Sequence, residues 1–502
     1  MSLLWFVIIY WVVSVAIGLY AARNVRNTKD FAIAGRQLPF YMVTATVFAT
    51  WFGAEAVLGI PATFLKEGMK GIVADPFGSS MCLILVGLFF AAPLYRMKLL
   101  TIGDFYKKRF GRGVELLTTI AIVLSYLGWV GAQIMALGLV FNVVSGGEIA
   151  KVTGMWIGSM TILIYTFFGG MWAVAVTDLI QMVIIVIGML YIGSEVSGMV
   201  GGVGVVVDHA MNAGKFQFLP ALDAKEILAF IAAWITMMLG SIPQQDVFQR
   251  VQSSKTEKIA VWGSILGGSL YFVFAFVPLF LAYSATLLDP KMVESLIDTD
   301  SQLILPRLIL DKAPLFAQIM FFGALLSAIK GCASATLLAP SVTFTENIMK
   351  PMMGPMSDKK LLLLMRCVTV VFTVLVTLYA VNSKASIFKM VENAYQVTLV
   401  SAFIPLVCGL YWRRATNQGA LLSIFSGVVT WLSVLLLIDD PFVPAQFAGL
   451  IASALGMLVG SLLPQGIYHN PAIHDDLRNG HLAQAPLAQS AAPTPQTSHQ
   501  VP

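Results

Sequence analysis

Long runs of apolar residues alternate along most of the chain with short segments rich in charge, glycine or proline. About 20 consecutive apolar residues are enough for a helix to cross the hydrocarbon core of a bilayer. The pattern therefore predicts an all-α polytopic membrane protein with about thirteen transmembrane helices. Their expected limits are 2–22, 40–64, 73–94, 115–145, 153–175, 177–197, 226–249, 260–284, 314–346, 361–382, 390–412, 417–437 and 442–464.

The positions of the basic residues predict how these spans are oriented. If the N-terminus faces outward, most of the 31 Lys and Arg residues fall in segments on the cytoplasmic side. Cytoplasmic loops of membrane proteins carry such an excess of Lys and Arg. We therefore expect an integral protein of the plasma (inner) membrane, with its N-terminus outside and its C-terminus in the cytoplasm.

The composition excludes several classes of protein. Apolar residues make up 58% of the chain and charged residues only 11%, against roughly 25% charged residues in soluble domains. A soluble enzyme and a nucleic-acid binder are both excluded, and no enzyme-like cluster of catalytic residues lies in the spans. We expect a membrane domain over 1–464 and a largely disordered cytoplasmic tail over 465–502, which is rich in Ala, Pro, Gln and Ser.

Two of the expected spans contain residues that interrupt helices. The second span carries Gly53 and Pro61 within the stretch 49–61, and the seventh carries Pro243 within 239–246. Transporters often bind solutes at such broken helices near the bilayer midplane. Helix kinks that serve packing alone are the alternative. The two interruptions lie five spans apart, as an inverted repeat of five plus five helices would place them.

Lys330 is the unusual residue of the ninth span. It lies about 15 residues from either end of the span, or roughly 23 Å of helix. Its side chain is too short to reach the membrane surface from there. A charge at the midplane costs at least about 2.5–3.5 kcal/mol, so the side chain needs a partner or a water-filled cavity.

Several motifs, taken in order, resemble the sodium:solute symporter family up to about residue 415, and the choline-transporter branch in particular. They are 49–61, 169–178, Gln245 with Gln249–Val251, Thr345–Asn347 and Gly409–Arg414 for the family, and Thr44–Trp51, Trp129 and Ile242–Pro243 for the branch. The resemblance implies thirteen helices with an inverted repeat and alternating access. It places the substrate between the second and seventh spans, lined also by the fourth and eleventh.

The resemblance also implies where a coupling sodium ion would bind. Its ligands would come from the carbonyl groups of Ala49 and Phe52 and from Ala328, Gly331 and Cys332. The last two positions carry hydroxyl groups in the family, whereas here they are glycine and cysteine. Hard cations need oxygen ligands, so the sodium site is expected to be degraded. An alignment shift of one or two residues would bring Ser327 or Ser334 to this place.

Aromatic and amide side chains form the expected substrate site, and they suit a small polar or cationic organic solute. The candidates are Trp51, Tyr126, Trp129, Gln133, Gln244, Gln245, Tyr395 and Gln396. Ordinary packing is the alternative role for the aromatic residues. The choline-like branch usually has an aromatic residue where Gln244 stands, which disfavours choline itself.

A cytoplasmic gate is expected from Asp178, Arg250 and Arg109, which lie at the same level near the inner membrane surface. Ion pairs there could close the pathway while it is open outward. Asp178 would begin the sixth span, so capping of a helix N-terminus is the alternative role for its carboxylate.

The coupling mechanism is predicted from Lys330 and Glu55. We hypothesise that Lys330 replaces the sodium ion, pairs with Glu55 and hydrogen-bonds the carbonyl groups that would bind sodium, so that transport does not require sodium. Sodium, protons or no ion at all remain open as the coupled species, and no other cofactor is expected. The rival function is a transporter-like sensor that binds a solute and signals through a partner protein. The expected partners are the solute and the lipid bilayer, while the solute itself and the oligomeric state stay open.

Overall fold

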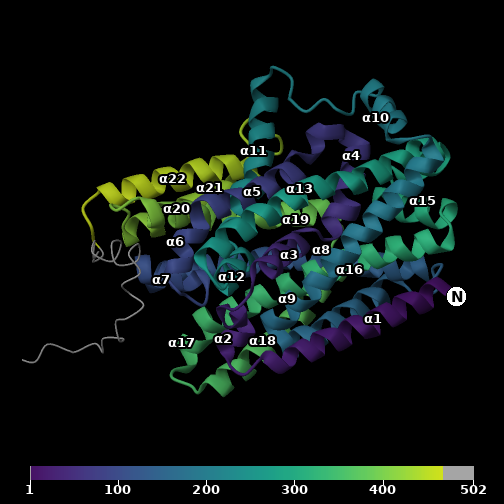
Figure 1. The fold of residues 1–502 in the computed structure, drawn as a ribbon. Helices are drawn as coiled ribbons and strands as arrows, with labels where there is room; N and C mark the ends of the chain where they lie inside the picture. Colours follow the sequence, from purple (N-terminus) through teal and green to yellow (C-terminus); the bar gives the residue numbers. More distant parts are fainter. Residues whose placement is uncertain (1, 467–502) are drawn as a thin grey trace, which may run out of the picture.

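The computed structural model describes residues 2–466, which form an elongated bundle of helices (Figure 1). The tail expected to be disordered therefore lies almost entirely outside the described residues. The long unbroken helices are α1 (Ser2–Ala21), α8 (Arg112–Val144), α13 (Glu257–Leu288), α16 (Leu315–Phe344), α18 (Asp358–Asn382), α21 (Asn417–Leu437) and α22 (Ala445–Leu462).

Other spans are built from shorter helices in series. They are α3 (Phe40–Trp51) with α4 (Ile60–Glu67), α5 (Ser79–Leu85) with α6 (Ala91–Arg96), α11 (Ala224–Gly240) with α12 (Gln245–Ser253), and α19 (Ile387–Thr398) with α20 (Ile404–Tyr411). Shorter helices lie between the spans. They are α2 (Thr28–Ile33), α7 (Ile102–Phe110), α10 (Val203–Asn212), α14 (Pro290–Leu296), α15 (Ile304–Lys312) and α17 (Lys350–Met353).

Ten helices in the described part of the chain are long and apolar enough to cross a membrane, or eleven if a bent pair is one span. This number is lower than the thirteen expected, because some helical runs are long and continuous. The run Lys151–Val200, helix α9, has 50 residues and would measure about 75 Å if straight. That length exceeds twice the hydrocarbon thickness of a bilayer, about 30 Å.

Gly170 divides α9 five residues before position 175, where the sequence predicts the end of the fifth span. Its φ of 47° and ψ of −140° are not helical. A β-carbon at Gly170 would lie 2.4 Å from the carbonyl oxygen of Phe31, so only glycine fits this close approach. Asp178 lies eight positions further on, inside the second part of α9, and not at the start of a helix as expected. The helix-capping role proposed for its carboxylate is therefore wrong.

Both predicted helix breaks are confirmed. The helix α3 ends before Phe52, whose φ of −85° and ψ of 72° leave the helical region, and a π-helical turn over Glu55–Gly59 follows. The helices α11 and α12 are bent by 43° at the segment 241–244. Proline at position 243 removes a backbone donor there and disfavours helix at the residue before it.

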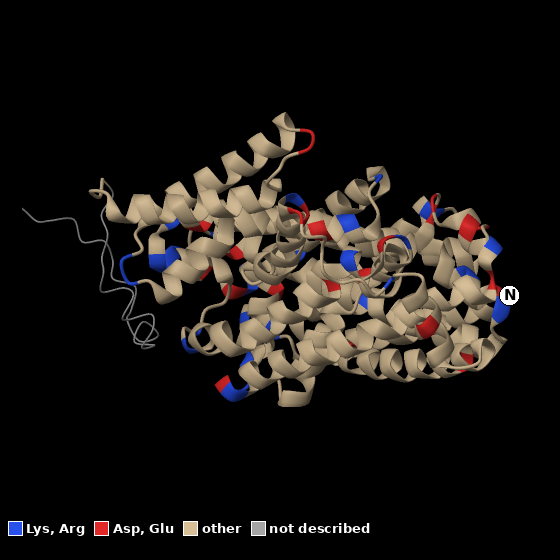
Figure 2. Cartoon of the chain, turned by 90° about the horizontal axis from the view of Figure 1, so that it is seen from above, with Lys and Arg blue, Asp and Glu red and all other residues tan. Residues whose placement is uncertain are grey.

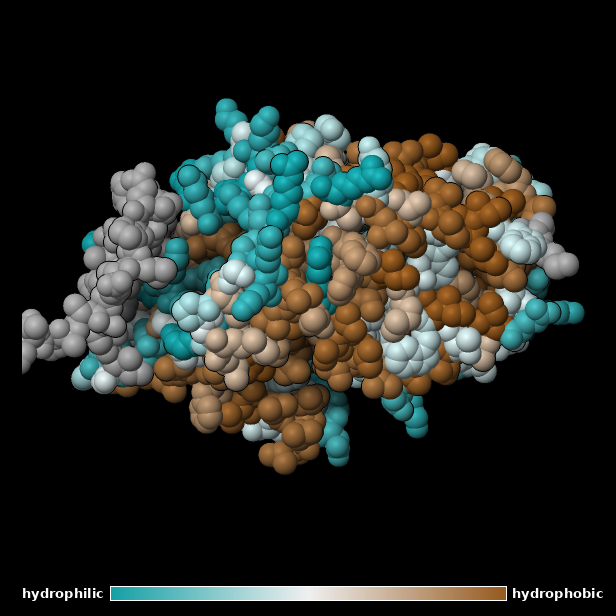
Figure 3. All heavy atoms as spheres, turned by 90° about the horizontal axis from the view of Figure 1, so that it is seen from below, coloured by the Kyte–Doolittle hydropathy of each residue, from teal (hydrophilic) through white to brown (hydrophobic). Residues whose placement is uncertain are grey.

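The helix α16 forms the centre of the bundle and packs against α8 and α9. Almost every side chain from Phe321 to Thr343 is buried, whereas α1, α18, α21 and α22 expose many large apolar side chains. Figure 3 shows apolar residues spread over much of one face, and in Figure 2 charged residues lie mostly at helix ends and in connecting segments. This distribution suits a surface in contact with lipid.

Candidate functional site

Three aromatic rings meet where the first broken helix faces α8 and α19. The ring centroids of Trp51 and Trp129 lie 5.3 Å apart, those of Trp129 and Tyr395 5.5 Å, and those of Trp51 and Tyr395 6.0 Å. Tyr126 stacks on Trp129 at 6.1 Å. All four side chains are buried, so the structure brings together the aromatic residues that the sequence assigned to the substrate site. We call Trp51, Trp129 and Tyr395 the aromatic box.

Glu55 lies at the edge of this box, in the π-helical turn after the break. Its carboxylate accepts hydrogen bonds from the indole nitrogen of Trp129 at 3.3 Å and from the amide nitrogen of Gln133 at 2.6 Å. The amide oxygen of Gln133 in turn accepts the backbone N–H of Ala54 at 2.8 Å. Gln133 therefore satisfies a backbone donor that the helix break leaves free, as well as holding the carboxylate.

The second broken helix supplies polar groups to the same region. The amide nitrogen of Gln244 donates to Ser125 at 2.9 Å and to Thr398 at 3.3 Å. Asp246 accepts a hydrogen bond from the hydroxyl group of Tyr126 at 2.5 Å. Sequence reasoning missed Asp246, although a carboxylate three residues after Pro243 could have drawn attention to it.

Two predicted substrate residues point away from the aromatic box. The amide oxygen of Gln245 accepts the backbone N–H of Ile102 at 2.8 Å and so joins α12 to α7. The amide oxygen of Gln396 accepts the indole N–H of Trp431 at 3.2 Å, on the side of α19 that faces α21. Because neighbouring residues of a helix point in different directions, the position of Tyr395 in the box turns Gln396 away from it.

Oxygen atoms surround Gly331 at the place where the resemblance implies a sodium ion. A β-carbon at Gly331 would lie 2.8 Å from the amide oxygen of Gln181, 3.2 Å from the carbonyl oxygen of Ala49 and 3.4 Å from Oδ1 of Asp178. Within the described residues, neither that amide oxygen nor Oδ1 has a hydrogen-bond partner. Phe52 and Ala328 are buried as well, while Cys332 contacts Glu55 at 3.9 Å through its sulfur. Gln181 was not among the predicted residues.

The predicted ion pair between Lys330 and Glu55 does not form. The ammonium group of Lys330 lies over the rings of Tyr10, Trp11 and Tyr165, 5.4, 5.5 and 5.7 Å from their centroids. It has no hydrogen-bond partner within residues 2–466, so it does not bond the carbonyl groups expected to bind sodium either. Lys330 directs its side chain toward α1 and α9, whereas Cys332, two residues later, faces Glu55.

The structure brings together two of the three residues predicted for a gate. Thr46 donates to Asp178, Thr50 donates to the carbonyl oxygen of Thr46, and Arg250 donates to Thr50 at 2.8 Å. One turn of α3, from Thr46 to Thr50, thus connects Asp178 with Arg250. Arg109 lies elsewhere: its guanidinium donates to the carbonyl oxygens of Gly409, Trp412 and Ala415. Those carbonyl groups lie around the C-terminal end of α20, where a cation is favourable, so Arg109 does not belong to the gate.

The fold and site define a class of protein: an all-helical membrane transporter in which two broken helices meet at a buried polar site. The sequence profile of the sodium:solute symporter family matches residues 31–427. The chain belongs to this family and is not an enzyme.

Relatives of known activity support the same assignment. The human high affinity choline transporter 1 is 26% identical over 452 residues, which cover 84% of this chain and 75% of that protein. The osmoregulated proline transporter of Bacillus subtilis is 23% identical over 488 residues, covering 89% of this chain and 93% of the relative. The solved structure of a Na⁺-coupled sialic acid symporter has a TM-score of 0.80 and 18% identity, and the match covers 94% of this chain and 99% of that one. The protein is therefore a secondary transporter with the fold of that symporter.

Proposed function

We propose that this transporter carries a small organic solute with an ammonium group, which binds between the aromatic box and Glu55. One observation carries the proposal: a buried carboxylate is hydrogen-bonded to one of three clustered aromatic rings. The faces of Trp and Tyr rings attract cations, and a desolvated cation gains about 2 kcal/mol or more from them. The rings touch one another, so a solute that binds between them has to separate them.

The balance of buried charge supports a cationic group. Six carboxylates are buried in the described residues, namely Glu55, Asp75, Glu115, Asp178, Asp246 and Glu392. The buried cations there are three, Arg109, Arg250 and Lys330. Buried charges are costly unless they are paired, so this region favours positively charged ligands.

We infer that sodium is the coupled ion and that it binds beside Gly331. The oxygen atoms of Ala49, Asp178 and Gln181 that converge there are the kind of ligand that hard cations require. Glycine at position 331 leaves room for an ion among them. The Lys330 side chain points toward Tyr10, Trp11 and Tyr165 and so does not occupy this place itself.

Thirteen spans with an inverted repeat of five plus five remain our proposal for the membrane topology. The proposal requires α9 to cross twice, with Gly170 between the crossings, and the helices from 55 to 96 to belong to two spans. The N-terminus then lies outside and the C-terminus in the cytoplasm. The breaks in α3–α4 and α11–α12 would occupy equivalent places in the two repeats.

Uptake into proteoliposomes under a sodium gradient tests the proposed solute class. We expect uptake of proline or another solute with an ammonium group, more readily than of choline, which Gln244 disfavours, and no uptake of glucose. Trp51→Ala and Trp129→Ala should each raise KM about tenfold, which corresponds to about 1.4 kcal/mol. Trp262→Ala is the control, because Trp262 is 60% exposed on α13 and should leave KM unchanged. If no ammonium-bearing solute is taken up, or if both box variants match the wild type, the proposal is wrong.

A further inference from the structure

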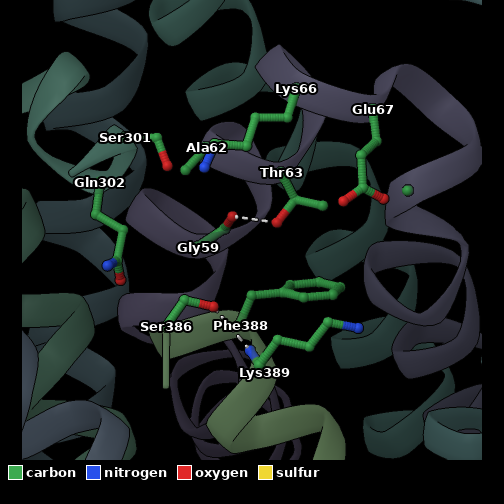
Figure 4. A pocket seen from close by; sticks show the side chains of 11 residues that line it. Gly59, Ala62, Thr63, Lys66, Glu67, Ser301, Gln302, Ser386, Phe388 and Lys389 are labelled. Atoms are coloured by element: carbon green, nitrogen blue, oxygen red, sulfur yellow. Dashed lines mark hydrogen bonds between the residues drawn. The ribbon is translucent and has the colours of Figure 1, made fainter. Parts of the chain in front are cut away.

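A pocket adjoins the first broken helix at Gly59 and α4, on the side that the proposed topology places outside (Figure 4). It has a volume of about 150 Å³ and is lined by residues of α4, of the segment 301–302 and of the start of α19. In Figure 4, Lys66 and Glu67 enter it from α4, and Phe388 and Lys389 enter from α19. Charged side chains of both signs therefore surround its opening.

The start of α19 forms one wall of this pocket and rests on the broken helix. A β-carbon at Gly59 would lie 3.2 Å from the backbone nitrogen of Phe388, so the two backbones are in close contact. The side chain of Gln302 accepts the backbone N–H of Ile387 at 3.1 Å and ties the outer segment to the same end of α19. The beginning of α19 is thus enclosed by the broken helix on one side and by an outer segment on the other.

One face of α19 leads from this pocket to the aromatic box. Phe388, Glu392 and Tyr395 are spaced by four and three residues, so their side chains lie in a row along the helix. Phe388 lines the pocket, and Tyr395 stacks on Trp51 inside the box. Glu392 lies between them, and only 9% of its side chain is exposed.

Lys389 covers this carboxylate. Its ammonium group lies 2.6 Å from Glu392 and 6.0 Å from the centre of the Phe388 ring. The lysine side chain is 60% exposed, so water can take over its solvation at little cost if it leaves. A buried carboxylate covered by an exposed, flexible cation can exchange that cation for another one.

Two other ion pairs among the described residues also join an exposed cation to a largely buried carboxylate, Arg112 with Glu115 and Lys350 with Glu346. Neither pair lines the outer pocket. The pair on α19 differs because it lies between a pocket and the aromatic box, and because an aromatic ring adjoins it.

We propose that Phe388, Lys389 and Glu392 form an outer recognition subsite, at which an organic ammonium ion displaces the Lys389 side chain from Glu392 before it enters the aromatic box. The subsite rests on the proposed function, since it selects the same chemical group. Phe388 would offer its ring face to the cation, and Glu392 would neutralise its charge. The aromatic box offers the same pair of groups, a ring from Tyr395 and a carboxylate from Glu55.

A thiol-reactive probe tests the subsite without relying on transport. In a Cys367→Ser background, which removes an exposed native thiol, Thr63→Cys provides a reporter inside the pocket. The rate of its modification by a trimethylammonium methanethiosulfonate is divided by the rate with a neutral methanethiosulfonate. We expect Glu392→Gln to lower this ratio about tenfold and Lys389→Met to raise it several-fold, because charge at the rim of a site acts mainly on association.

Lys384→Met is the matched control, because it removes a positive charge from an exposed residue of the outer loop five positions before Lys389. It should change the ratio less than twofold. The subsite is ruled out if both test variants stay within twofold of the reporter protein or shift the ratio in the same direction. A ratio that responds as expected, in a protein that takes up no ammonium-bearing solute, would keep the subsite and reject the proposed cargo. Uptake of an ammonium-bearing solute together with an unresponsive ratio would reject the subsite and keep the proposed cargo.

Discussion

Aromatic faces surround the ammonium group of Lys330, and no carboxylate among residues 2–466 forms an ion pair with it. Tyr10 of α1 also hydrogen-bonds Ser327 at 2.5 Å, and Tyr165 of α9 donates to the carbonyl oxygen of Lys330 at 3.3 Å. The residue therefore joins three helices on the side of α16 away from the aromatic box. Its place in the sequence beside the expected sodium ligands says little about its role, because the direction of a side chain turns by about 100° with each residue of a helix.

At the residue scale, Lys330→Met should keep uptake within about threefold of the wild type and leave its ion dependence unchanged. Methionine fills a similar volume, and the lost cation–π contacts are worth about 2 kcal/mol in stability.

Asp178→Asn, in contrast, should reduce the apparent affinity for sodium at least tenfold, since it weakens a charged oxygen ligand. Uptake measured against sodium concentration checks both variants. Loss of ion dependence in Lys330→Met alone would restore the lysine to the coupling mechanism.

Glu55 provides a second prediction at this scale. Glu55→Gln should raise KM for an ammonium-bearing solute about tenfold or more, since it removes a charge that the low dielectric makes effective. Glu294→Gln changes the same charge on an exposed residue of α14 and should leave KM as it is. Initial uptake rates over a range of solute concentrations separate the two outcomes, and equal KM values for both variants would contradict the assignment of Glu55.

At the scale of elements, Gly170 is the residue on which the division of α9 depends. Gly170→Ala places a side chain 2.4 Å from a backbone oxygen at a φ of 47°, so we expect a loss of at least about 2 kcal/mol in stability. Gly198→Ala lies in the same helix with nothing within 4 Å of the new carbon and should be neutral or slightly stabilising. Thermal unfolding of the purified variants checks the difference. A Gly170 variant as stable as the Gly198 variant would show that the backbone can relax there.

The elements were far more predictable than the contacts between them. Gly53, Pro243 and the Gly169–Gly170 pair mark breaks in the sequence because glycine and proline act on their own backbone. The hydrogen bonds of Glu55 to Trp129 and Gln133 join residues more than 70 positions apart, and no local rule reports them. The same holds for the direction of Lys330 and for the role of Gln181. The position of a residue in a helix shows which other element its side chain contacts only after the neighbouring helices have been placed.

At the scale of the whole molecule, sodium dependence is the decisive measurement. Uptake should fall at least tenfold when potassium replaces sodium outside, with the membrane potential clamped and the pH equal on both sides. The expected cause is that the oxygen atoms around Gly331 lose their ion. Uptake that continues unchanged in potassium would support the sodium-free mechanism that the sequence suggested. A response to a pH gradient under the same conditions would point to protons.

The amide of Gln133 gives the first broken helix a fixed pivot. Its oxygen accepts the backbone N–H of Ala54, which has no helical partner, and its nitrogen donates to Glu55. Gln133 belongs to α8, a continuous helix of 33 residues. Rotation of α4 about the break could therefore keep both hydrogen bonds of Gln133. A translation of the break along α8 would break both of them. A cargo that moves the carboxylate of Glu55 away from Gln133 would weaken the hydrogen bond between these two residues, and so one of the two bonds that hold the break to α8. Under the proposed function, binding of the cargo at Glu55 and movement of the helix break would both involve the amide group of Gln133.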